Sequence, residues 1–129
     1  MPTIELTKDN LDSTIEDNAI VFIDFWAEWC GPCKMFGPIF KAASDKYTDM
    51  VFASCNTEQQ QEVAGSFGIR SIPTLAVFRE KILVFMQPGA LPAAALEEII
   101  EKVKELDMDE VRADIEKQKA EQEKEDKKD

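Results

Sequence analysis

Two cysteines separated by two residues carry the strongest chemical signal in the sequence. Cys30 and Cys33 stand in the segment Trp29-Cys-Gly-Pro-Cys-Lys34, directly after an apolar run and at the start of a helical pattern. A helix N-terminus offers unpaired N–H groups and the positive end of the helix dipole, which stabilise a thiolate and lower the pKa of a cysteine placed there. We therefore predict Cys30 as the nucleophile and Cys33, one turn later and more buried, as the partner that closes a small disulfide ring.

The two residues between the cysteines fit the same position. Pro32 costs nothing in a first helical turn, because its missing N–H would have no partner there, and its fixed φ restrains the ring. Gly31 leaves the approach to Cys30 unobstructed. The strand-then-helix setting, more than the spacing of the cysteines, supports a redox-active pair.

Asp24 is the second chemical candidate, because it interrupts the apolar run of residues 19–26. Burial disfavours an ionised carboxylate, so we expect the pKa of Asp24 to rise toward the range of a general base at neutral pH. The sequence also leaves open an aspartate that turns to the sheet edge or accepts a backbone hydrogen bond.

Composition excludes several other kinds of site. The chain has no histidine, so it can form neither a Ser-His-Asp triad nor a Cys-His nucleophile pair nor a histidine-containing zinc site. Its formal net charge of −11 argues against nucleic-acid binding, which depends on Lys and Arg releasing counterions. We interpret the third cysteine, Cys55, as a buried strand residue that packs as a small hydrophobe, with a redox or metal-binding role as the alternative.

The length of the chain and the composition of its segments indicate in which cellular compartment the protein works. The 129 residues fit one domain with an ordinary core, and an odd number of cysteines is not typical of a secreted disulfide framework. The first residues lack a basic stretch followed by an apolar one, and the apolar runs are short. We therefore expect a cytoplasmic protein without a membrane span.

Alternating strands and helices are predicted along the chain, and they must position the two cysteines and Asp24. Apolar runs rich in β-branched and aromatic residues predict strands at 3–6, 19–26, 50–55, 74–78 and 82–86. Apolar residues at helical spacing predict helices at 34–47, 58–67 and 91–106, and a brief helix, carrying Leu11 and Ile15, after an N-cap at Thr7. This order predicts an α/β fold with a mixed central sheet of about five strands flanked by helices.

The residues after position 106 differ in kind. Asp107 to Glu110 resembles a capping box with aspartate as the cap, and a short apolar stripe that begins at Met108 predicts a brief helix. Beyond Gln118 the chain is almost entirely polar, so we expect a solvated, fraying or disordered tail. The predicted organisation is a domain at 1–106 and a charged helical extension at 107–129.

Three segments resemble the thioredoxin family: DFWAEWCGPCK at 24–34, GIRSIPT at 68–74 and PGAL at 88–91. With the element order, the resemblance spans the first 106 residues and implies the thioredoxin fold and protein-disulfide reductase activity. It implies that Asp24 helps to deprotonate Cys33, and that no bound cofactor is needed. The implied partners are disulfide-containing client proteins and an NADPH-dependent thioredoxin reductase that restores the dithiol of a monomeric protein.

The resemblance also implies a substrate surface. Pro73 would follow a cis peptide bond and lie against the cysteine pair, although a trans bond is far more common for a proline at large. The backbone of Ile72 would dock the substrate, on a flat and partly apolar platform suited to an extended peptide. The residues implied for this surface are Trp29, Gly31, Pro32, Ile72, Pro73, Gly89 and Ala90.

Three departures from the family pattern stand out. Thioredoxins commonly carry a lysine in the third strand near the buried aspartate, but here Ser54 or Cys55 occupies its place, and without a cation the pKa of Asp24 would climb further. Arg79-Glu80-Lys81 replaces the usual Asn-Gly turn, and residues 107–129 have no counterpart in the short thioredoxins.

Two other functions stay open. One is a binding or chaperone-like module that uses the same platform and the tail, with redox chemistry incidental. The other is an oxidase or isomerase in an oxidising compartment, against which Gly31-Pro32 and the missing signal segment favour a reductant.

Overall fold

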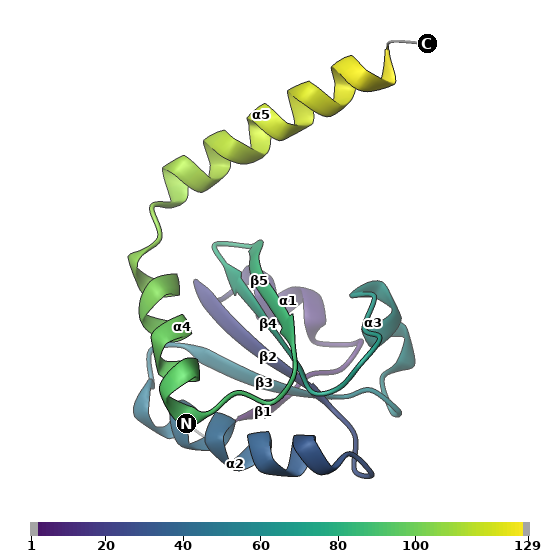
Figure 1. Cartoon of the computed structure of the whole chain (residues 1–129), viewed down its shortest axis with the longest axis vertical. Helices are drawn as coiled ribbons and strands as arrows, with labels where there is room; N and C mark the ends of the chain where they lie inside the picture. Colours follow the sequence, from purple (N-terminus) through teal and green to yellow (C-terminus); the bar gives the residue numbers. More distant parts are fainter. Residues whose placement is uncertain (1–2, 128–129) are drawn as a thin grey trace.

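The chain folds as one mixed sheet wrapped by helices. The computed structural model describes residues 3–127, which contain a five-stranded sheet in the order β1-β3-β2-β4-β5 (Figure 1). The elements are β1 (Ile4–Glu5), α1 (Leu11–Glu16), β2 (Ile20–Trp26), α2 (Gly31–Lys46), β3 (Val51–Asn56), α3 (Gln61–Ser66), β4 (Thr74–Arg79), β5 (Ile82–Pro88), α4 (Ala93–Glu105) and α5 (Met108–Asp126). The predicted α/β architecture is confirmed.

Helices cover both faces of the sheet. On one face α2 and α4 pack on aromatic side chains of the strands, with Phe36 and Phe40 of α2 and Ile100 of α4 buried in one cluster. On the other face α1 and α3 cover a second cluster, to which α3 contributes Val63. Strand β2 is therefore buried on both sides, which explains its nearly continuous apolar sequence.

Strand pairing places Asp24 in the middle of the sheet. Strand β2 runs parallel to β3 and antiparallel to β4, so Asp24 lies opposite Ser54 on one side and Leu75 on the other. Side chains alternate along a strand, so Asp24 and Ser54 share the face that is covered by α2, whereas Cys55 lies on the opposite face with Phe25. Cys55 is buried in that second cluster, as the sequence predicted.

Three helices begin later than predicted: α4 starts two residues late, at Ala93, and α1 and α3 start late because asparagine side chains hold the preceding turns. Helix α1 starts at Leu11, and the predicted N-cap Thr7 is wrong: its N–H donates to Asn10 Oδ1 at 2.7 Å. Helix α3 starts at Gln61, because Asn56 Oδ1 accepts from the next backbone N–H groups and keeps the chain in a turn. Asparagine competes with a helical backbone for hydrogen bonds in both places.

The β4–β5 hairpin turns without glycine. Glu80 and Lys81 form its two-residue connection and have φ values of 50° and 71°. Positive φ at both central residues is the geometry of a type I′ turn, which favours Asn-Gly. The departure from the family pattern thus changes the residues of the turn and preserves its geometry.

Replacing Lys81 by glycine is expected to stabilise the protein by about 1 kcal/mol. Left-handed backbone costs a residue with a Cβ roughly 1–2 kcal/mol, and the greater freedom of glycine in the unfolded chain offsets part of that gain. Urea unfolding of the variant measures the difference. The matched control is Gly68→Ala, since Gly68 has a φ of 65° and open space around it. That variant should lose a comparable amount, and a Lys81→Gly variant less stable than wild type would contradict the argument.

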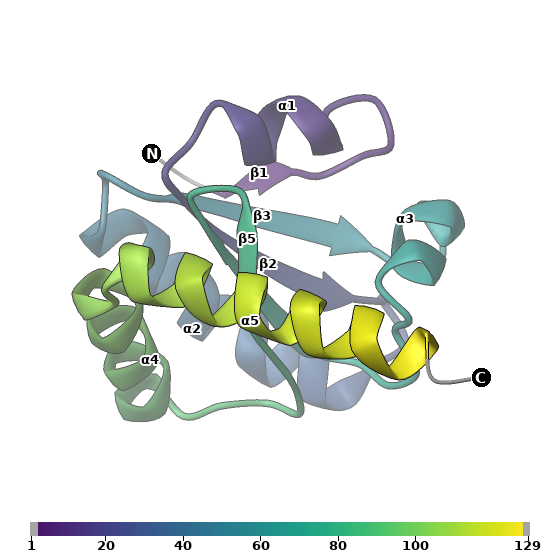
Figure 2. The ribbon, with the colours of Figure 1, turned by 90° about the horizontal axis from the view of Figure 1, so that it is seen from above.

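Helix α5 is longer than the sequence suggested. It runs unbroken from Met108 to Asp126, so the expected fraying beyond Gln118 is wrong. Asp107 caps it as predicted, accepting from the N–H groups of Asp109 and Glu110. The helix carries few apolar residues. It projects from the rest of the molecule in Figure 1, and in the view from above it crosses in front of the sheet (Figure 2). Its helix-forming composition and pairs such as Lys119–Glu116 support it without a buried face along its length.

The hairpin end holds the junction between α4 and α5. The Arg79 guanidinium donates to the carbonyl oxygens of Val103 at 2.6 Å and Leu106 at 2.8 Å, which belong to the last turn of α4 and its C-cap. Such carbonyls lack partners within a helix, so the guanidinium acts as a side-chain cap. The neighbouring Glu80 pairs with Arg112 of α5 at 3.1 Å.

Candidate active site

The cysteine pair lies where β2 gives way to α2. Cys30 is the N-cap of α2, and its Sγ accepts from the N–H of Cys33 at 3.2 Å. The two residues are joined as a disulfide, with their Cα atoms 5.2 Å apart. Pro32 lies in the first helical turn, where a missing N–H costs nothing. In the reduced state, the hydrogen bond and the helix dipole would act on a Cys30 thiolate and stabilise it.

The prediction that Cys33 is the more buried of the pair is wrong, because each cysteine is 4% exposed. They differ instead in the space that they face. Cys30 lines a groove of about 660 Å³ together with Trp29, whereas Cys33 lines a separate cavity of about 540 Å³ together with Asp24. The fold thus gives the two sulfurs different neighbours at equal burial.

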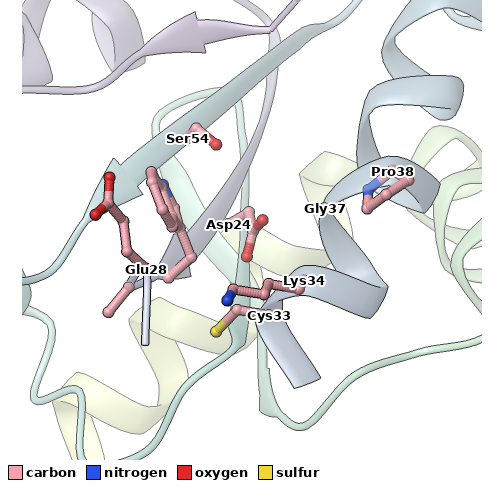
Figure 3. A pocket seen from close by; sticks show the side chains of 9 residues that line it. Asp24, Glu28, Cys33, Lys34, Gly37, Pro38 and Ser54 are labelled. Atoms are coloured by element: carbon pink, nitrogen blue, oxygen red, sulfur yellow. The ribbon is translucent and has the colours of Figure 1, made fainter. Parts of the chain in front are cut away.

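The cavity on the Cys33 side contains the buried carboxylate. Figure 3 shows Asp24 between Ser54 of β3 and Cys33 of α2 in this view. Asp24 is 2% exposed, and its Oδ1 has no hydrogen-bond partner among the described residues. Desolvation on burial raises the pKa of Asp24 from its ordinary value of 3.8 to about 7. The alternatives of an aspartate at the sheet edge or satisfied by a backbone amide are therefore not what the structure shows.

Ser54 takes the place of the lysine that the family commonly has in the third strand. It lies opposite Asp24 in the sheet register and lines the same cavity, and its hydroxyl supplies no positive charge there. Among the described residues, the cation that lines this cavity is Lys34, an exposed residue of α2. Burial also raises the pKa of the Cys55 thiol to about 11, with a smaller contribution from the charge of Asp24, so Cys55 stays protonated at neutral pH.

The groove on the Cys30 side is built from three parts of the chain. The active-site turn contributes residues 29–32, α3 and the turn before it contribute Thr57, Gln61, Ala64 and Gly65, and the loop before β4 contributes residues 69–72. Trp29 is 69% exposed, and its indole N–H donates to a carboxylate oxygen of Glu58, which holds the ring at the rim. The predicted contact role of Trp29, rather than a core role, agrees with this exposure.

A helix-ending motif sets the course of the loop before β4. After α3, Gly68 adopts a φ of 65°, its N–H donates to the Gly65 carbonyl, and the Ile69 N–H donates to the Ala64 carbonyl. These two bonds and the left-handed glycine form a Schellman motif, which ends α3 at Ser66, one residue before the end of the helix predicted at 58–67. The chain leaves the motif along the groove and enters β4 at Thr74.

The peptide bond between Ile72 and Pro73 is cis, as the resemblance implied. Pro73 is buried, and the Ile72 carbonyl oxygen lies 3.6 Å from Cys30 Sγ. Gly89 is tied to this loop, because its N–H donates to the Pro73 carbonyl at 2.8 Å. Gly89 and Ala90 are exposed but do not line the groove, so the structure brings together only part of the expected platform.

Sequence reasoning missed several residues of the two spaces. Glu28 and Lys34 line the cavity of Asp24, and Arg70 lines the groove of Cys30. Each of the three lies inside a segment that resembles the thioredoxin family. The one signal in the sequence was therefore that each lies close to a predicted site residue. What could not be read from the sequence is which of the two spaces each side chain faces.

Comparisons with known proteins agree with this geometry. The thioredoxin family model matches residues 2–105. "Putative thioredoxin 2" of Streptomyces coelicolor is 56% identical over 118 residues, covering 92% of this chain and 88% of its own, and "Thioredoxin 1" of Synechococcus elongatus is 39% identical over 89 residues, covering 68% and 83%. The Streptomyces match covers more of the chain than the family model does, so the similarity continues beyond the predicted domain.

Solved structures give the same answer. A thioredoxin from Plasmodium falciparum superimposes with a TM-score of 0.72 at 38% identity, over 78% of this chain and 98% of its own. A mutant thioredoxin from Halobacterium salinarum reaches a TM-score of 0.76 at 32% identity, over 82% and 94%. With a redox-active cysteine pair at the expected position, the protein is a thiol-disulfide oxidoreductase that performs dithiol-disulfide exchange through Cys30 and Cys33. By sequence, fold and site, the chain belongs to the thioredoxin family.

Proposed function

We propose that the protein reduces client disulfides, with Cys30 as the attacking thiolate and Cys33 as the resolving thiol. Cys30 attacks one sulfur of the client, which breaks the client disulfide, forms a mixed disulfide and releases one client thiolate. Cys33 then attacks the Cys30 sulfur, forms the Cys30–Cys33 disulfide and releases the second client thiolate. Two electrons pass to the client, the proton of Cys33 ends on one client thiolate, and the other client thiolate takes its proton from water.

The order of attack follows from the surroundings of the two sulfurs. Cys30 faces the open groove and accepts the Cys33 N–H, so it is the cysteine that a client can reach and that the helix terminus activates. Cys33 shares a cavity with Asp24, whose raised pKa of about 7 suits it to take a proton at neutral pH. We assign to Asp24 the deprotonation of Cys33 and the return of that proton to the departing client thiolate.

The surface around Cys30 supports an extended client segment. Trp29, Gly31, Pro32 and Ile72 lie along the groove, and the Ile72 carbonyl beside the Cys30 sulfur offers a backbone acceptor. We include Pro73 as the residue that sets the direction of this backbone, and Gly89 and Ala90 as outer contacts, reached through the bond between Gly89 and Pro73.

Thioredoxins act on disulfide-containing substrates and are reduced by thioredoxin reductase, which here is proposed to be an NADPH-dependent flavoprotein. We also propose a monomer that works in the cytoplasm, with a domain at 1–106 and a charged extension at 107–129. No helix within residues 3–127 is long and apolar enough to cross a membrane.

Reduction of insulin disulfides by dithiothreitol tests the proposal. Wild type should accelerate the reaction strongly, and Cys30→Ser should fall to the rate without protein, because no other sulfur faces the groove within residues 3–127. Cys55→Ser is the matched control and should keep wild-type activity, since Cys55 is buried on the opposite face. Equal slow rates for wild type and Cys30→Ser would favour the binding or chaperone-like module, and a strongly oxidising equilibrium with glutathione would favour an oxidase.

A further inference from the structure

The groove beside Cys30 carries one charge. Apolar, small and neutral polar side chains form most of its lining, and within the described residues the exposed Arg70 is the one charged residue among them. Its guanidinium has no ion-pair partner among residues 3–127. Other cations of the described residues, such as Lys34 and Lys41, also lack an ion-pair partner, but none of them lines this groove.

Two acidic residues that follow groove-lining residues in the sequence, Glu58 after Thr57 and Glu62 after Gln61, have partners of their own. Glu58 accepts the indole N–H of Trp29 at the rim, and Glu62 of α3 pairs with Lys8 at 2.7 Å. Neither lines the groove. Among residues 3–127, Arg70 is therefore the charged residue of the lining that a client residue in the groove would meet.

The position of Arg70 limits which client residue it can reach. It precedes Ile72 by two residues, and the Ile72 carbonyl oxygen lies 3.6 Å from Cys30 Sγ. An extended peptide advances about 3.3 Å per residue, so a side chain within roughly two or three positions of the attacked cysteine lies within reach of the guanidinium.

The positive charge of Arg70 attracts an acidic client residue, whereas the net negative charge of the protein repels it. The acidic molecule as a whole repels an acidic client, but the Debye length is about 8 Å at physiological ionic strength, so distant carboxylates are largely screened. A carboxylate in direct contact with Arg70 is not screened in this way and forms a charge-assisted hydrogen bond. Close contact therefore decides the preference.

We propose that Arg70 forms a subsite for acidic residues, so that the protein prefers client segments with Asp or Glu within about two positions of the attacked cysteine. This inference rests on the proposed function, because it assumes that the client disulfide reaches Cys30 through the groove. It adds a specificity determinant to that reaction and leaves the exchange chemistry unchanged.

Peptides that differ in one charge test the subsite. Each contains one cysteine, in disulfide linkage to 2-mercaptoethanol, with Glu, Gln or Lys two positions before or after it. The second-order rate constant for reaction with the reduced full-length protein is divided by the rate constant for dithiothreitol, which removes the intrinsic reactivity of each peptide. We expect the Glu peptide to react about threefold faster than the Gln peptide in at least one position and the Lys peptide to react more slowly, the size of effect that a single exposed ion pair gives.

Three variants assign the effect. Arg70→Gln should bring the normalised rate constants of the Glu and Gln peptides to the same value, and Arg70→Lys should keep most of the difference between them. Arg112→Gln is the matched control, since it removes the same charge from α5, away from the groove, and should keep the preference. A preference that survives in Arg70→Gln, or a faster Lys peptide, would overturn the subsite. Reduction of all peptides at one common rate would overturn it too while leaving the reductase proposal intact, whereas no reduction of any peptide would count against both.

Discussion

Replacing Asp24 by asparagine is expected to raise the free energy of unfolding by up to about 4 kcal/mol above pH 7. The pKa of Asp24 rises from an ordinary 3.8 to about 7 because burial disfavours its charged form, and each unit of difference corresponds to about 1.4 kcal/mol. Folded protein holds the proton that unfolded protein has released, so wild type loses stability as the pH rises from 3.8 to about 7. Asparagine carries no charge and avoids this loss.

Urea unfolding at several pH values checks the expectation. Wild type and Asp24→Asn should be similar near pH 4, diverge as the pH rises through the interval, and differ by a constant amount above it. Asp49→Asn is the matched control, because Asp49 is exposed, and should show no such divergence. A gain in Asp24→Asn that is the same at pH 4 and pH 8 would show that packing, rather than ionisation, is responsible.

The same substitution should slow the resolving step. Without a carboxylate beside Cys33, the thiol must lose its proton to water, and we expect the second step to slow by about 10²-fold near pH 7, at the low end of general-base contributions. Single-turnover release of the second client thiol measures this step separately from the attack by Cys30. The role assigned to Asp24 is wrong if the variant resolves the mixed disulfide at the wild-type rate.

Replacing Cys33 by serine is expected to abolish turnover while the first attack continues. Cys30 keeps its place at the helix terminus and its access to the groove, so it still breaks the client disulfide. A serine hydroxyl cannot displace the client sulfur, so the mixed disulfide accumulates. Mass spectrometry of the protein after mixing with a disulfide substrate should show a mass increase of one client chain, which a thiol reductant removes.

The paired control is the double variant Cys30→Ser and Cys33→Ser, which should gain no client mass. Cys55 remains in both proteins and is fully buried, so it should not form the adduct. An adduct on the double variant would identify Cys55 as reactive and contradict its assignment as a core residue. Identification of the trapped clients would then also show whether acidic residues flank the captured cysteines.

The central sheet could be predicted from the sequence because buried strands consist almost entirely of apolar residues. Strand β2 is enclosed by helices on both faces, and only apolar residues at 20–23 satisfy both sides. Asp24 could be recognised for the same reason, since it is the one charged residue in that run. Pro32 indicated a first helical turn directly after Cys30, but the predicted helix at 34–47 began three residues later than α2, which starts at Gly31.

The start of α1, the burial of the two cysteines and the length of α5 could not be predicted, because the sequence is compatible with more than one outcome for each. Thr7 and Asn10 are both acceptable helix caps, and the side-chain bond from Asn10 to the Thr7 backbone decided where α1 begins. The burial of Cys30 and Cys33 depends on the packing of the whole active-site turn, which one-turn spacing does not determine. Helix α5 was underestimated because its stability comes from its cap and local ion pairs, whereas the prediction relied on an apolar stripe.

The anchorage of α5 by the hairpin has a practical consequence for attaching the protein to something else. Arg79, which binds the end of α4, pairs with Ile20 at the start of β2, whereas the active-site turn follows Trp26 at its end, so the full length of the central strand separates the two. Glu80, whose N–H donates to the Ala19 carbonyl before β2, pairs with Arg112 and so holds the first turns of α5 near the start of that strand. Figure 1 shows α5 leaving the molecule from this end. A fluorophore, a surface or a second enzyme coupled through the C-terminal helix would therefore be held away from the groove, and large client proteins could still dock at Cys30.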